Sequence, residues 1–166
     1  MVEMSGNIGV VVVFGVEVDA DSDNAVNFIR TLLFDNQDVP RDIFNNFDIY
    51  YDFYVLGKGT EPDTTDGYYD LYPYFQDAVI GSCLRNGDTT IRCFRQACCL
   101  SGEWKKKIVI GFQVAHVCDV WISPKGIDLP LMTDAMVENV KLQLSEYGFP
   151  TDTKTFFILD DCISCT

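Results

Sequence analysis

Positive charge is scarce in this chain, and histidine is almost absent. The 166 residues include 12 Lys and Arg side chains against 25 Asp and Glu, for a formal net charge of -13, and there is one histidine. Such a charge repels phosphate backbones and anionic lipid headgroups. We therefore expect no direct binding to nucleic acid or to a membrane, and a protein partner with a basic surface. Solubility alone is the other account of the charge.

Long hydrophobic runs are also missing. No stretch approaches the roughly 18 apolar residues that a membrane-spanning helix needs. The first residues, MVEMSGN, carry Glu3 and no Lys or Arg, whereas a secretory signal starts with a positively charged segment. The sequence predicts a soluble intracellular protein, with cytoplasm and nucleus equally open. Its seven cysteines, an odd number, are then expected to be reduced thiols, several of them buried.

Familiar catalytic patterns are missing too: the chain has no Ser-His-Asp pattern, P-loop or G-x-G-x-x-G. His116 and Cys118 would share one face of a strand, but neighbours in one strand rarely have the crossing geometry of a Cys-His pair. Cys162 and Cys165 have C-x-x-C spacing without a following helix or a second pair, so residues 162–166 are expected to be a flexible thiol tail.

What the chain does contain favours a single globular domain over residues 1–166. Hydrophobic residues make up 48% of it, and it contains only six prolines. Disorder is therefore not expected. The apolar run from Ile8 to Val18 is rich in β-branched residues and predicts a central strand buried on both faces. Ser22 or Asp23 can then begin a helix. Apolar residues recur after them at helical spacing, at Ala25, Val26, Ile29, Leu32 and Leu33.

The later segments alternate between strand and helix signals. FDIYYDFYVLG, aromatic and β-branched, predicts a second strand, and the polar KGTEPDTTDG after it predicts an exposed loop. Asn86-Gly87 suits a type I′ turn and predicts a β-hairpin, and the long strand that follows within WKKKIVIGFQVAHVCDVWI extends it to a three-stranded antiparallel meander. Thr133 and Gly148 bound a predicted helix. KTFFILDD predicts the last strand.

A seven-residue pattern occurs twice in the chain and is called the echo motif below. VVFGVEV and IVIGFQV share three apolar residues, Gly, an apolar residue, Glu or Gln, and Val. A predicted helix and strand follow each copy, as a duplicated β-α-β unit would produce. Gly15 and Gly111 would mark equivalent bulges or close backbone approaches. We expect an α+β fold, ferredoxin-like in broad outline, with a mostly antiparallel sheet of about six strands and two helices on one face. Residues 57–106 would be a loop and hairpin inserted between the halves.

Three aspartates alternate where the first strand is expected to end. Asp19, Asp21 and Asp23 form a D-x-D-x-D pattern, which can deliver several oxygens to a divalent cation such as Ca²⁺. An EF-hand loop has a bidentate Glu at its twelfth position, and here that position is Arg30. An acidic helix start that complements the helix dipole explains the same residues. The pattern therefore has two interpretations: a divalent-cation site at these aspartates, or a helix start in a protein without a cofactor.

The same strand end has an enzymatic interpretation. VEVDAD and FFILDD each end a hydrophobic run with acidic residues, and this resembles the haloacid-dehalogenase-like phosphatases. The resemblance implies that Asp19 is a nucleophile, Asp21 an acid/base, and Asp160 and Asp161 partners of Mg²⁺. That family has Thr or Val where this chain has Asp23. A Mg²⁺-dependent phosphohydrolase is the alternative function, and a calcium-binding module is a further one.

Tyrosines cluster in the middle of the chain, where seven of the eight lie between Tyr50 and Tyr74. Tyrosine buries a large area at small entropic cost and keeps a polar tip, so it anchors many protein interfaces. The expected binding residues are Tyr68, Tyr69, Tyr72 and Tyr74, with packing of the loop as the alternative. The favoured function is a non-enzymatic acidic interaction protein that binds a basic protein, or its own copy through an exposed strand edge.

Overall fold

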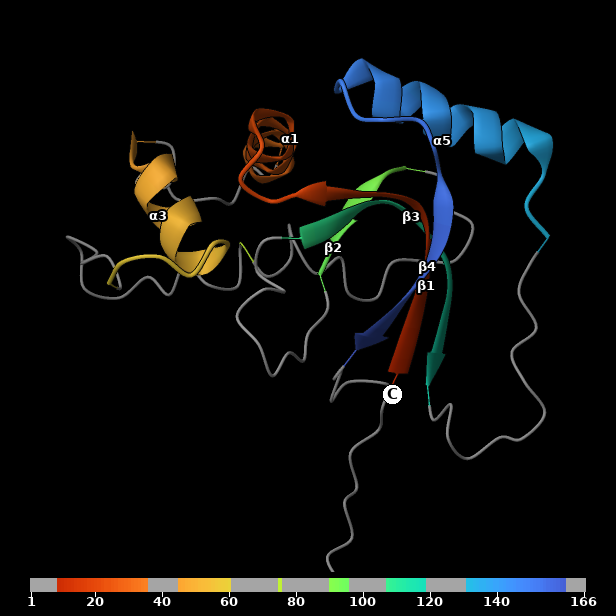
Figure 1. Ribbon diagram of the computed structural model, residues 1–166, viewed down its shortest axis with the longest axis horizontal. Coiled ribbons are helices and arrows are strands. Elements are labelled where there is room, and N and C mark those ends of the chain that lie inside the picture. Colours follow the sequence, from red (N-terminus) through yellow and green to blue (C-terminus); the bar gives the residue numbers. More distant parts are fainter. Residues whose placement is uncertain are drawn as a thin grey trace, which may run out of the picture.

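A four-stranded antiparallel sheet and three helices make up the described part of the chain (Figure 1). The computed structural model describes residues 9–35, 45–60, 75, 90–95, 107–118 and 131–160. For residues 9, 117, 118, 159 and 160 it describes the backbone alone. The fold is therefore of the α+β class, as the sequence predicts.

The sheet has the strand order β2-β3-β1-β4, and every pair of neighbours is antiparallel. The strands are β1 (Gly9–Asp19), β2 (Arg92–Phe94), β3 (Lys107–Cys118) and β4 (Lys154–Asp160). The helices are α1 (Asp23–Phe34), α3 (Phe47–Tyr54) and α5 (Asp134–Glu146). Each long strand is formed by a run of β-branched or aromatic residues, which fit a half-buried or buried sheet position.

β1 is central and buried on both faces, as its uninterrupted apolar run predicts. It pairs with β3 along one edge and with β4 along the other. Val12 and Val13 point to opposite faces of the strand, and both have 0% exposure. A strand buried on both faces needs apolar residues at successive positions, which explains why the sequence here does not alternate.

Gly15 of β1 stands directly opposite Gly111 of β3, and the two backbones approach closely there. A Cβ atom on Gly15 would lie 2.0 Å from the carbonyl oxygen of Ile110. Both strands bend sharply near the middle of the sheet (Figure 1). The predicted close approach at the two glycines is confirmed, whereas the irregularity in the ladder lies between Val12 and Val13 instead.

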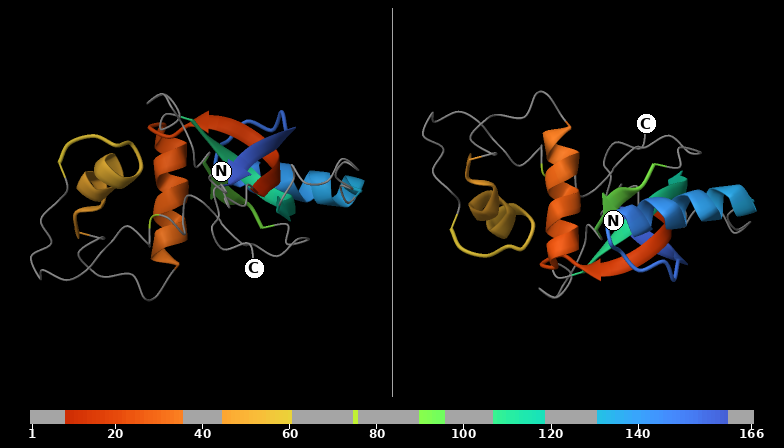
Figure 2. Two further views of the ribbon diagram at one scale, coloured as in Figure 1. Left: turned by 90° about the horizontal axis from the view of Figure 1, so that it is seen from below. Right: turned by 90° about the horizontal axis from the view of Figure 1, so that it is seen from above.

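The two faces of the sheet are different. One face carries the main core, to which all three helices contribute buried side chains such as Phe28, Tyr51 and Val140. Figures 1 and 2 show α1 and α5 on the same side of the sheet, with α1 between α3 and α5. The other face, called the helix-free face below, carries a second cluster formed by Val11, Val13, Phe94, Val109 and Ile158, with Phe156 against it. No helix among the described residues contributes to that cluster.

The helix from residue 134 begins and ends where its sequence predicts. The Thr133 side chain accepts a hydrogen bond from the backbone N–H of Met136 at 3.2 Å, which satisfies one of the free donors of the first turn. Gly148 has a φ of 77°, the left-handed conformation that terminates helices. On the buried side, Val140 and Leu144 are both 0% exposed. The apolar stripe and the caps indicate the same helix, and α5 confirms that prediction.

The predicted strand at residues 47–57 is wrong, because Phe47–Tyr54 forms helix α3. Its aromatic residues recur at helical spacing, so Phe47, Tyr50 and Tyr51 are buried on one side, while Asp48 and Asp52 are exposed on the other. The preference of aromatic residues for strands depends on packing against a pleated, half-buried surface. Here packing against α1, including a ring contact between Phe34 and Phe47, overrides that preference.

The described residues contain four strands instead of six, and three helices instead of two. β2 is the second strand of the predicted hairpin, and it pairs antiparallel with β3 as predicted. Asn86 and Gly87, the predicted turn, lie outside the described residues. So do most of the predicted insertion at 57–106 and the predicted tail at 162–166.

Candidate functional site

The acidic turn after β1 is built by Ser22 together with the aspartates. Both the backbone N–H and the hydroxyl of Ser22 donate to the carbonyl oxygen of Asp19, at 3.1 Å and 2.7 Å. The Ser22 oxygen in turn accepts from the backbone N–H of Ala25 at 3.4 Å. Ser22 therefore caps α1, and Asp23 places a negative charge in the first turn of that helix, where it complements the helix dipole.

Asp19 has a cationic partner across the sheet. Its Oδ1 lies 2.7 Å from Nζ of Lys107, which stands opposite it in the ladder between β1 and β3. The hydrogen bond to Asp19 raises the pKa of Lys107, and the negative charges of Asp19, Glu17 and Asp21 raise it further. Lys107 is thus a cation surrounded by three carboxylates. An exposed pair of this kind adds little stability, because water and salt screen it.

The predicted metal residues lie along one turn of the chain. Asp19, Asp21 and Asp23 are all exposed there. Among the residues that the structure describes, no group of three or more His, Cys, Asp or Glu side chains could hold a metal ion. The divalent-cation site stays a prediction, and the observed partners of Asp19 are Lys107 and the Ser22 cap.

The residues implied by the phosphatase resemblance do not meet at one sheet end. β4 runs antiparallel to β1, and Asp160 is the ladder partner of Gly9. Asp19 lies at the other end of β1, while Asp161 is outside the described residues. A strand-end nucleophile and a metal-binding carboxylate need to lie within one coordination sphere. This antiparallel register places Asp19 and Asp160 at opposite ends of one long strand.

The helix α3 is held next to the acidic turn by buried polar contacts. The Tyr51 hydroxyl donates to the carbonyl oxygen of Ala20 at 2.5 Å. Nη1 of Arg95 donates to the carbonyl oxygen of Val55 at 2.8 Å, at the end of α3 where the helix dipole favours a cation. Burial raises the pKa of Tyr51 well above its usual value, and the negative charge of Asp52 adds to this. Two buried contacts therefore fix α3 against the sheet.

This packing gathers exposed carboxylates from two elements. Glu17 and Asp19 end β1, Asp21 lies in the turn, and Asp52 projects from α3. Asp21 and Asp52 both act electrostatically on the Tyr51 hydroxyl, so the turn and the helix surface are neighbours. We call Glu17, Asp19, Asp21 and Asp52 the acidic rim. Three of the rim residues, Glu17, Asp19 and Asp21, raise the pKa of Lys107.

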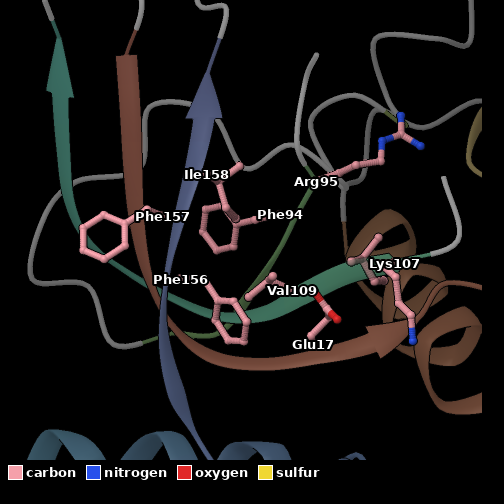
Figure 3. A pocket seen from close by; sticks show the side chains of 9 residues that line it. Glu17, Phe94, Arg95, Lys107, Val109, Phe156, Phe157 and Ile158 are labelled. Atoms are coloured by element: carbon pink, nitrogen blue, oxygen red, sulfur yellow. The ribbon is translucent and has the colours of Figure 1, made fainter. Parts of the chain in front are cut away.

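A small hollow lies beside the rim on the helix-free face (Figure 3). Its volume is about 180 Å³, below the roughly 300–1,000 Å³ typical of small-molecule sites. Its lining includes the aromatic residues Phe94 and Phe156 and the charged residues Glu17 and Lys107. The Arg95 guanidinium points away from it (Figure 3), towards Val55. An apolar floor with a carboxylate at its edge suits a long side chain with a cationic end.

The other predicted functional residues contribute less to this surface. Tyr68, Tyr69, Tyr72 and Tyr74 lie outside the described residues, as do Cys162 and Cys165. His116 lies in β3 opposite Val11, and the side chain of Cys118 is not among those described. No helix in the described segments is both long and apolar enough to cross a membrane.

Cys93 of β2 is a free thiol with 0% exposure. Burial raises its pKa to about 12, against a smaller opposite effect of the Arg95 charge. The reactive form of cysteine is the thiolate. A thiol that keeps its proton in the core is therefore structural, as the prediction of reduced, buried cysteines implies for this one.

Lys107 and Arg95 are the site residues that the sequence did not single out. Lys107 belongs to a run of three lysines, WKKK, and nothing in that run shows which one faces Asp19. Only the register of β1 against β3 decides it. Arg95 follows a short strand, and its partner Val55 is set by the helix that the sequence predicted as a strand.

In comparisons with known proteins, no family model, no curated protein and no solved structure matches this chain.

Proposed function

We propose that this chain is a non-enzymatic interaction protein that binds a basic protein through the acidic rim. The observation that carries the proposal is the group of exposed carboxylates at Glu17, Asp19 and Asp21 around the ammonium of Lys107. Complementary potentials speed encounter and select partners more than they add raw affinity. A formal charge of -13 extends that attraction over the whole chain.

The hollow beside the rim supports a basic partner more than a small molecule. A partner lysine or arginine could lay its aliphatic stem on Phe94 and Phe156 and direct its charge to Glu17. Cations also interact favourably with the faces of aromatic rings. The apolar floor would then supply part of the binding free energy, and the rim would supply orientation and selectivity.

The tyrosines of the central segment form a second part of the proposed contact. Tyr68, Tyr69, Tyr72 and Tyr74 are of the residue type that anchors interfaces. Replacing Tyr68 and Tyr69 with alanine should weaken partner binding and leave the thermal stability of the free chain unchanged. A loss of stability with intact binding would instead mean that these rings pack against the domain.

The rim is tested by neutralising it and, separately, an equal charge elsewhere. The test variant combines Glu17→Gln, Asp21→Asn and Asp52→Asn, which leaves the pair between Asp19 and Lys107 in place. Its matched control neutralises three exposed acids of the C-terminal part, Glu138, Glu146 and Asp152. Both variants have the same net charge, so a difference between them reports position and not total charge.

Binding is measured by calorimetry with a lysine- and arginine-rich peptide at low and physiological salt, and by capture of partners from cells. Three exposed charge pairs at about 0.2–1 kcal/mol each correspond to roughly a threefold to hundredfold loss. The rim variant should show that loss and the control should not. Equal weakening in both would mean that only the net charge matters, and equal binding in both would contradict the proposal.

We also propose that the chain contains a duplicated β-α-β unit, which makes the fold ferredoxin-like in outline. In the ladder between β1 and β3, Gly15 stands opposite Gly111. The two copies of the echo motif therefore pair with each other, and the glycine of one copy lies opposite the glycine of the other. Each half also supplies the outer strand next to the other half's central strand, giving the order β2-β3-β1-β4.

The outer strands β2 and β4 take equivalent positions relative to the two glycines. Arg92 of β2 stands opposite Gly111, and Lys154 of β4 stands opposite Gly15. Two residues later each strand has a phenylalanine, Phe94 and Phe156, and both belong to the cluster on the helix-free face. A determined structure tests this: superposing the halves should place Arg92 on Lys154, and a superposition that requires another offset would contradict the duplication.

A further inference from the structure

The outer edge of β4 is a strand edge that the described sheet leaves without a partner strand over its whole length. β4 lies at one end of the order β2-β3-β1-β4 and pairs with β1 alone. The opposite end of the sheet is β2, which has three residues. Phe157 of β4 is 63% exposed, and Figure 3 shows its ring on the side of β4 away from Phe94 and Phe156. An exposed edge with an aromatic residue invites pairing with another strand.

The sequence of this edge is complementary to itself in the antiparallel direction. KTFFILD places Lys154 three residues before Phe157 and Asp160 three residues after it. When two copies of the strand pair about Phe157, Lys154 stands opposite Asp160 of the second copy, at both ends. The two Phe157 residues stand opposite each other at the centre. Opposite charges and aromatic pairs are favourable cross-strand neighbours.

We propose that β4 pairs with β4 of a second copy of this chain, joining the two sheets into one. The contact is isologous, so a two-fold axis passes next to Phe157 and the assembly closes at two copies. A parallel arrangement in the same register would put Lys154 against Lys154 and Asp160 against Asp160. Antiparallel pairing shifted by two residues would break both ion pairs. Charge therefore selects one direction and one register.

The high net charge of the chain does not prevent this contact. At physiological salt the Debye length is about 8 Å, so most of the -13 charge on one copy is screened from the other. The paired ends of the strand lie in contact and are screened less. None of the rim carboxylates belongs to β4, whereas Phe156, Phe157 and Ile158 of β4 also line the hollow beside the rim. The proposal goes beyond the proposed function because its occupant is the chain itself.

The test reverses one charge at a time. Lys154→Asp places two carboxylates opposite each other at both ends of the paired strands, and Asp160→Lys places two ammonium groups there. Each single variant should dimerise roughly tenfold to a hundredfold more weakly than the natural chain. Mixing the two variants makes every end complementary again, so the mixture should form a heterodimer. The variant with both reversals should regain the homodimer.

Sedimentation equilibrium over a range of protein concentrations at about 0.15 M salt measures the masses. Phe157→Lys, at an exposed position, should also be monomeric, and circular dichroism checks that each variant is folded. The proposal is overturned if the natural chain is monomeric at the highest concentration. It is also overturned if the mixture stays as dissociated as its components. The rim variant with Glu17→Gln, Asp21→Asn and Asp52→Asn changes no residue of β4, so it should still form the dimer while it loses peptide binding, and the two proposals fail separately.

Discussion

Replacing Gly15 with alanine should destabilise the sheet at its centre. A Cβ atom there would lie 2.0 Å from the carbonyl oxygen of Ile110 and 2.6 Å from the Cα of Gly111. Both neighbours are backbone atoms, so no side chain can rotate away. A carbon and an oxygen rest at about 3.3 Å or more, and the strands would therefore have to separate locally by roughly 1.3 Å.

A separation of that size breaks the ladder on either side of the substitution. An N–H···O bond with a normal length near 2.9 Å would be stretched past 4 Å and lost. Losing two bonds between buried backbone groups costs roughly 2–4 kcal/mol. Alanine is otherwise favoured over glycine in a strand by about 0.5–1 kcal/mol, so the clash outweighs the propensity and the sign of the effect is destabilising.

Urea unfolding followed by circular dichroism measures this cost, and thermal unfolding should show a fall in Tm of roughly 4–16 °C. Gly59→Ala is the control, because nothing lies within 4 Å of a Cβ there and only its φ of +80° resists the change. Gly111→Ala should behave like the Gly15 variant, and the double variant should cost less than the two combined, since either one already parts the strands. A neutral or stabilised Gly15→Ala would refute the close approach.

Three other perturbations test the core and the acidic turn. Because burial raises the pKa of Cys93 to about 12, the unfolded chain releases this proton first as the pH rises. The free energy of unfolding should then fall above about pH 9 by up to about 1.4 kcal/mol per pH unit, and urea titrations of Cys93→Ala should lack that component. Tyr51→Phe removes the donor to Ala20 and should cost about 1–3 kcal/mol in chemical denaturation. Ser22→Ala should cost about 1 kcal/mol in thermal unfolding, and Ser22→Asp should largely preserve stability because it retains a cap.

The elements with redundant local signals could be predicted from the sequence. The helix from residue 134 combines a cap at Thr133, an apolar stripe and a glycine at 148. β1 is an apolar run that leaves no alternative to a buried strand. The seven-residue echo motif predicted equivalent bulges or close backbone approaches at Gly15 and Gly111, and the register of β1 against β3 adds that the two glycines stand opposite each other.

Helix α3 shows why residue type alone misleads. Phe47, Tyr50 and Tyr51 have strand-forming side chains, and the prediction followed their type. The period of the pattern was the better signal, since Asp48 and Asp52 lie one helical turn apart and both are exposed. Tertiary packing decides between the two for a short aromatic segment, and that packing involves α1, a separate element that the local pattern of residues 47–54 does not reveal.

The acidic rim was predicted only in part. Asp19 and Asp21 stood out by their spacing, and the sequence could place them at a strand end. It could not reveal that Lys107 crosses the ladder to Asp19, or that Asp52 approaches from α3. Both facts depend on strand register and helix packing, which arise from contacts between residues far apart in the chain.

The placement of β1 in the middle of the sheet has a consequence during synthesis. β1 ends at Asp19, but its two neighbours begin at Lys107 and Lys154. At about 5–20 residues per second the ribosome needs on the order of 10 seconds to produce both neighbours. Until β3 has been made, the nascent chain displays a valine-rich segment with neither of its sheet neighbours, the kind of aggregation-prone stretch that chaperones bind. This protein should therefore depend on such assistance more than a fold with sequence-adjacent strands.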